Sequence, residues 1–167
     1  MNCKKCGREI SENDTYCPGC GAKQVMTYRE VFDRRGLSEK DFIGNINKWF
    51  QWHPKAANIK CTYHLKDSYG LFVNKYKLQQ FVIEYELFEN DNENQYGLVK
   101  MEKYALVKKS LEKCVAEWQS THPQVQVVNW QGGTNSRGSS GSLLLGGLGA
   151  SNRMTAFIFF KFPRKQG

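Results

Sequence analysis

Two Cys-x-x-Cys pairs near the start of the chain restrict its possible folds more than any other feature. The stretch "CKKCGREISENDTYCPGCG" spans residues 3–21, and a glycine follows each pair directly. A Cys-x-x-Cys turn holds two sulfurs close enough to bind one ion, and glycine accepts the positive φ with which such a turn closes. Four thiolates around one ion form the closed tetrahedral site that is typical of structural zinc. The sequence therefore predicts four metal ligands: Cys3, Cys6, Cys17 and Cys20.

Other uses of paired cysteines fit this stretch less well. Disulfides form in oxidising compartments, whereas we expect the protein in the cytoplasm, since no apolar leader precedes the cysteine module. A thioredoxin-like redox motif has one pair at a helix start, not two pairs followed by glycines. Iron in a rubredoxin-type site uses the same four ligands, so Fe stays open beside Zn²⁺, which we favour. A module of about 20 residues buries too little core to fold without its metal.

Residues 1–24, "MNCKKCGREISENDTYCPGCGAKQ", resemble the short zinc ribbons that begin many bacterial proteins. The resemblance covers both cysteine pairs, including "CPGCG", and does not extend to residues 25–167. It implies a metal-stabilised hairpin module with zinc as its cofactor. It implies little about activity, because ribbons of this kind precede very different partners.

Behind the ribbon, the pattern predicts a connector at residues 25–38 and one α+β domain at residues 39–167. Within the connector, "TYREVFDRRG" fits a short helix that ends at its glycine. Apolar residues at helical spacing predict two longer helices, one over residues 39–52 with Ser38 as its N-cap and one over residues 106–120. A His-Pro dipeptide ends each of them.

Alternation of apolar and polar residues predicts the strands of this domain. The expected strands lie at residues 59–65, 69–73, 77–88, 96–106, 124–130 and 154–162, with a polar hairpin loop at 89–95. We expect the first of these to follow one another as an antiparallel meander. The predicted fold is therefore α+β: an N-terminal four-cysteine zinc ribbon, then a mainly antiparallel sheet packed with two helices on one face.

A glycine-rich stretch at residues 132–153 is the second candidate site, because a loop this long in a compact domain is usually functional or disordered. Two of its glycines have P-loop spacing, but the lysine that should follow the second one is missing. Backbone N–H groups could still hold an anion such as a phosphorylated ligand. The candidate residues are Gly133, Arg137, Gly138, Ser139 and Arg153. Four leucines in the same loop favour docking on the protein itself, on a second copy or on a partner.

Charge and residue distribution limit the function classes. The formal net charge of +8 favours acidic partners, but Lys and Arg are spread along the chain rather than gathered in one stripe. No apolar stretch reaches the roughly 20 residues that a membrane helix needs. The sequence shows no nucleophile–base pair and no pair of catalytic acids. We therefore predict a cytoplasmic, zinc-binding, non-catalytic interaction protein; nucleic-acid binding, and an enzyme that holds a phosphorylated ligand at the glycine-rich loop, stay open.

Overall fold

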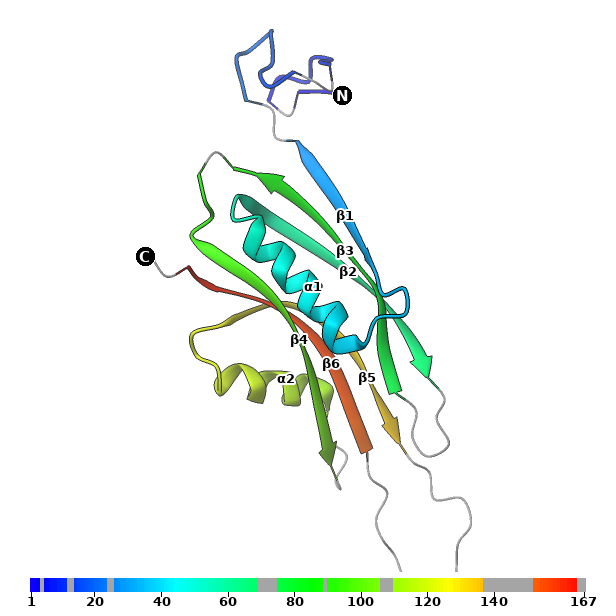
Figure 1. Ribbon diagram of the computed structural model, residues 1–167. Helices are drawn as coiled ribbons and strands as arrows, with labels where there is room; N and C mark the ends of the chain where they lie inside the picture. Colours follow the sequence, from blue (N-terminus) through cyan, green and yellow to red (C-terminus); the bar gives the residue numbers. More distant parts are fainter. Residues whose placement is uncertain are drawn as a thin grey trace, which may run out of the picture.

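A computed structural model describes residues 1–3, 5–11, 14–23, 26–68, 75–88, 90–105, 110–136 and 152–164. Behind the ribbon, its elements follow in the order β1 (Thr27–Asp33), α1 (Glu39–Trp52), β2 (Ala56–Ser68), β3 (Lys75–Leu87), β4 (Asn94–Ala105), α2 (Leu111–Ser120), β5 (Gln126–Ser136) and β6 (Asn152–Pro163) (Figure 1). The strand predicted at residues 69–73, and residues 106–109 of the second predicted helix, lie outside the described residues.

The described strands form two three-stranded antiparallel sheets, and the predicted α+β class is confirmed. The first sheet has the order β1-β3-β2 and the second the order β4-β6-β5. Each half of the domain therefore repeats one β-α-β-β unit, in which the last strand lies between the other two. Figure 1 shows α1 lying between the two sheets and α2 lying beyond the second one.

The meander predicted from residues 77–88 to residues 96–106 is wrong. β3 pairs with β1 along one edge and with β2 along the other, so β4 finds no free edge and begins the second sheet. The short helix predicted in "TYREVFDRRG" is also wrong, because residues 27–33 of this segment form strand β1. Its aromatic rings Tyr28 and Phe32 contact Tyr85 and Phe81 of β3, and this partner overrides a local preference for helix.

β6 is buried on both of its faces, and residues 153–159 are all buried. Phe157 and Phe159 belong to the core cluster that contains α1 and the first sheet. Ile158 belongs to the cluster that contains α2. The two helices therefore pack on opposite sides of the second sheet, which corrects the expectation that both cover one face. A strand covered on both sides needs a continuous apolar run, and "MTAFIFF" provides it.

Both helices begin and end with the same local interactions. Ser38 caps α1 and Ser110 caps α2, each by accepting a backbone N–H from the third residue of its helix. At the other end the His53 ring stacks on Trp49, with centroids 4.1 Å apart, and its Nδ1 lies 2.8 Å from the Trp49 carbonyl oxygen. The second helix ends in the same way, with a stacked Trp118–His122 pair and the same Nδ1 to carbonyl distance of 2.8 Å. Since a carbonyl only accepts, Nδ1 carries the hydrogen in both rings.

The two halves are joined through the free edge of β4. The Asn47 side chain on α1 donates from Nδ2 to the Leu98 carbonyl at 3.0 Å, and the Leu98 N–H donates to Asn47 Oδ1 at 2.7 Å. The amide thus takes the place that a peptide group of a neighbouring strand would fill. It satisfies the β4 backbone and covers the edge at this point.

A network of four charged residues lies at the start of α1. Lys100 on β4 contacts Glu39 of α1 and Glu102 of its own strand, the latter at 2.5 Å. Arg153 on β6 donates to Glu102 at 2.6 Å and is 9% exposed. Partial burial disfavours the charged Glu102 carboxylate, but the hydrogen bonds and charges of Lys100 and Arg153 outweigh this effect and lower its pKa.

We expect Asn47→Ala to lower the free energy of unfolding by about 1–3 kcal/mol, because it leaves a partly buried backbone N–H and C=O of β4 without partners. Urea denaturation followed by circular dichroism measures the change. Asn45→Ala, on the exposed side of the same helix, is the matched control and should change stability by less than about 0.5 kcal/mol. Equal effects of the two substitutions would contradict the proposed role of Asn47.

Acid titration tests the charged network. Because the pKa of Glu102 is below its ordinary value of 4.5 in the folded protein, its stabilising contribution is present above that pH and is lost as the pH falls through the lower value. We expect Glu102→Gln to flatten the loss of stability measured by urea denaturation from about pH 7 to about pH 3. Glu112→Gln, on the exposed side of α2, should leave the slope as it is in the unsubstituted protein.

Candidate metal centre

The cysteine module consists of two similar turns, each closed by a short antiparallel bridge. The first turn is closed by the bridge Asn2↔Glu9 and the second by the bridge Tyr16↔Lys23. In each turn the glycine after the cysteine pair donates its N–H to the carbonyl of the first cysteine, at 2.9 Å for Gly7 and 2.8 Å for Gly21. Both glycines have positive φ, 72° and 65°, as the sequence predicted.

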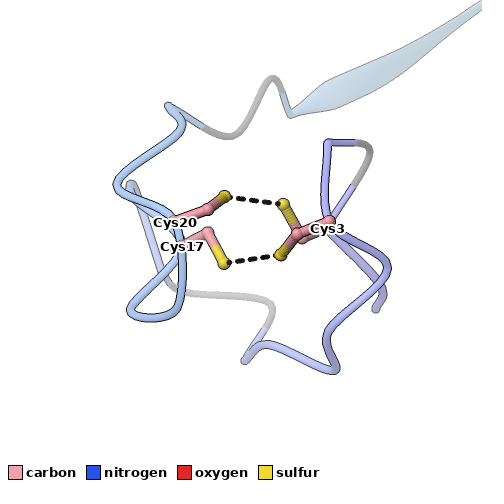
Figure 2. Close-up of side chains that lie close together, drawn as sticks. Cys3, Cys17 and Cys20 are labelled. Carbon is pink, nitrogen blue, oxygen red and sulfur yellow. Dashed lines mark hydrogen bonds between the residues drawn. The ribbon is translucent and has the colours of Figure 1, made fainter.

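The four sulfurs meet between the two turns (Figure 2). Cys3 Sγ lies 3.6 Å from Cys20 Sγ, Cys6 Sγ lies 3.6 Å from Cys17 Sγ, and all four sulfurs lie within 4.8 Å of one another. A disulfide has a bond of about 2.05 Å, so these contacts are not disulfides. A tetrahedral site with Zn–S bonds of about 2.3 Å has edges of about 3.8 Å. The predicted ligands thus come together in a geometry that fits one zinc ion.

Backbone N–H groups point at the sulfurs and favour the charged thiolate. Lys5 N–H donates to Cys3 Sγ, and Gly19 N–H donates to Cys17 Sγ, both at 3.4 Å. N–H groups of Cys6 and Lys5 lower the pKa of Cys3 to about 6. For Cys20, the Ala22 N–H acts in the same direction, but burial and the neighbouring thiols outweigh it and raise the pKa to about 12. The four cysteines would hold a cation as thiolates, and the positive charge of that cation would favour loss of their protons.

Ile10 and Gly19 also contribute to the packing of the module, and the cysteine spacing indicates neither contact. Ile10 is 5% exposed and packs with Cys3 and Cys17 in a small apolar cluster. Its signal in the sequence is its place as an apolar residue between the cysteine pairs. Gly19 lies under the Arg8 side chain, because a Cβ at this position would be 2.8 Å from Arg8 Nε. A larger residue at this position would make the Arg8 side chain move.

The structure describes two of the five candidate residues of the second predicted site, Gly133 and Arg153. Both ends of the predicted loop at residues 132–153 are strand, because β5 continues to Ser136 and β6 begins at Asn152. Gly133 lies in β5 under the Tyr76 ring, where a Cβ would approach the ring to 2.2 Å. Arg153 lies in β6 and binds Glu102. The remaining candidates, Arg137, Gly138 and Ser139, and the four leucines of the loop lie outside the described residues.

The other cysteines and the histidines lie apart from one another. Cys61 is half-buried at the junction of the sheets, where the Asn129 amide donates to its Sγ at 3.6 Å. Cys114 is buried on α2, where its thiol contacts the Met154 sulfur. His64 is exposed on β2. In the part of the chain that the structure describes, only the four ribbon cysteines gather as a group that could hold a metal ion.

Neither helix that the structure describes combines the length and the hydrophobicity that crossing a bilayer requires. Residues 2–24 match the family model of the zinc-ribbon domain, whereas no family model matches the rest of the chain. No curated protein and no solved structure matches the chain. The N-terminal module is therefore a zinc ribbon by sequence and by the arrangement of its cysteines, and it supports zinc binding by this protein.

Proposed function

We propose that this protein is a non-catalytic interaction protein in which zinc has a structural role. The observation that carries this proposal is the closed cluster of four cysteine sulfurs within 4.8 Å of one another. An ion held by four thiolates has no open position for a substrate or an activated water molecule. Six cysteines without a disulfide also favour a reducing compartment, and we propose a cytoplasmic location for that reason.

The histidines support a non-catalytic role. The rings of His53 and His122 are stacked on tryptophans and bonded to helix carbonyls, so their positions are explained by the ends of α1 and α2. The enzyme alternative, with a phosphorylated ligand at the glycine-rich loop, has less support. Two of its candidate residues serve the sheet instead: Gly133 accommodates Tyr76, and Arg153 is paired with Glu102.

Nucleic-acid binding is the second candidate, and the outer face of the first sheet favours it. Lys66 of β2 lies directly opposite Lys77 of β3 in the register, and His64 lies opposite Gln80 nearby. Like charges facing each other across a strand pair destabilise a sheet by tenths of a kcal/mol. A bound phosphate group would relieve this repulsion, and the backbone of a nucleic acid would provide such a group.

Metal content tests the role of the ribbon. We expect one zinc ion per chain, and we expect Cys17→Ser to lose it, because three thiolates hold the ion far less tightly than four. Chelation should unfold the ribbon while the α+β domain stays folded, since no cluster of metal-ligating side chains lies in its core among the described residues. Elemental analysis and amide-resolved NMR measure both effects. Cys61→Ser is the matched control and should keep the zinc. Iron in place of zinc, or zinc retained by Cys17→Ser, would contradict the proposal.

Titration with single- and double-stranded DNA and RNA at two salt concentrations separates the two candidate functions. If the outer face binds phosphate, affinity should be greatest at low salt, and Lys66→Glu with Lys77→Glu should reduce it by about tenfold or more. An equal change of charge at Lys40 and Lys48 on the exposed side of α1 is the control. Absence of binding at low salt would exclude nucleic acid as the partner and leave the protein-interaction proposal standing.

A further inference from the structure

Three of the four sheet edges that the described strands form are already protected. Asn47 and α1 cover the edge of β4. The edges of β2 and β5 meet each other, where the Tyr63 hydroxyl donates to the Asn129 carbonyl at 3.2 Å. Both strands also have irregular register, β2 beside Asn58 with its positive φ of 51° and β5 beside Asn129. Bulges and covering groups of this kind prevent further strands from pairing.

β1 is the remaining edge, and it has none of these protections among the described residues. Its register with β3 is regular from Thr27 to Asp33, and its sequence "TYREVFD" contains no proline, glycine or lysine. Val31 is 39% exposed and Tyr28 is 38% exposed. Figure 1 shows β1 along the outer margin of its sheet. A regular, exposed edge strand is a template for pairing with another strand.

The hydrogen-bonding direction of β1 follows from its neighbour. The Arg34 N–H donates to the Gln79 carbonyl of the β3 segment. In an antiparallel ladder, residues alternate between pointing both backbone groups toward one neighbour and pointing both toward the other. The backbone N–H and C=O groups of Arg29, Val31 and Asp33 therefore point away from β3, toward the open edge.

We propose that two copies of this chain pair through β1, antiparallel and centred on Val31, so that the two first sheets join into one. This interface does not depend on the zinc ribbon or on its proposed role. In this register Val31 faces the partner's Val31, and Arg29 faces the partner's Asp33. By the two-fold symmetry, Asp33 faces the partner's Arg29, so two ion pairs flank a central apolar contact.

Charge favours this register over those centred two residues away on either side. Centring the pair on Arg29 would place two arginines opposite each other, and centring it on Asp33 would place two aspartates opposite each other. Both arrangements are unfavourable for directly facing residues. Of the registers centred on a residue with outward-pointing backbone groups, the one on Val31 is the one that pairs opposite charges. The side chains concerned lie on one face of the sheet, the outer face that also carries Glu84.

The groups already bound to Asp33 leave room for this contact. Gln80 donates to Asp33 Oδ1 at 2.8 Å from the neighbouring strand, and Arg35 contacts Oδ2 at 3.4 Å. The Arg35 side chain is 84% exposed, so this pair is weak and yields easily to a closer cation. A strand-edge interface is small, and we expect a dimer in the micromolar range of dissociation constants.

Sedimentation equilibrium of the full chain over a range of concentrations tests the proposal, with a dimer of twice the chain mass of 19.3 kDa as the expected result. Arg29→Asp places two like pairs in the interface and should weaken the dimer at least about tenfold. Asp33→Arg should do the same. The double variant R29D/D33R restores opposite charges in the same register and should return the dissociation constant to within about threefold of the original. A role confined to one copy would not show this rescue.

Two controls separate the interface from effects on folding. Lys66→Asp reverses a charge on the same outer face but at the opposite edge, and it should leave the dimer unchanged. Val31→Pro removes an outward N–H without removing a bond to β3. This variant should be monomeric by sedimentation equilibrium and folded by circular dichroism. A wild-type chain that stays monomeric at the highest attainable concentration overturns the proposal. A dimer that keeps its affinity in both single variants, Arg29→Asp and Asp33→Arg, also overturns the proposal.

Discussion

The burial of β6 on both faces is the constraint on which the rest of the domain depends. A strand with apolar side chains on each side needs a cover on each side. α2 supplies one cover, and α1 together with the first sheet supplies the other. The second half of the chain therefore cannot reach its final packing without the first. The repeated β-α-β-β order does not make two independent domains, because Phe157 and Phe159 belong to a core that both halves share.

Several polar side chains of the domain cover the edges of its two sheets. A buried core with two separate sheets has more edges than a barrel, and each edge exposes backbone groups that must be satisfied or covered. Asn47 covers one edge from a helix, and the Tyr63–Asn129 contact closes two more against each other. The charged network around Glu102 serves a related purpose, since it lets α1 begin beside β4 and β6 with the partly buried charges paired.

The zinc ribbon follows a different physical rule from the domain behind it. Its own apolar cluster contains little beyond Ile10 and the cysteines themselves, so metal coordination replaces a hydrophobic core. Because each turn is stabilised by bonds within itself, we expect the site to form without help from the sheets. The comparisons agree with this expectation in one respect, since the ribbon matches a family model and the rest of the chain matches none.

The sequence by itself determined whatever depends on neighbours along the chain. The spacing of Cys3, Cys6, Cys17 and Cys20 predicted the metal cluster, and the Ser38 cap and the His-Pro ends predicted α1 and the end of α2. Only the tertiary structure decided what depends on a partner far away in sequence. Segment 27–33 became a strand because β3 offered it an edge, and β4 was then excluded from that sheet. Gly133 and Arg153, two candidate residues of the predicted loop, lie in strands and meet Tyr76 and Glu102, because the pairing of β5 with β6 extends into that stretch.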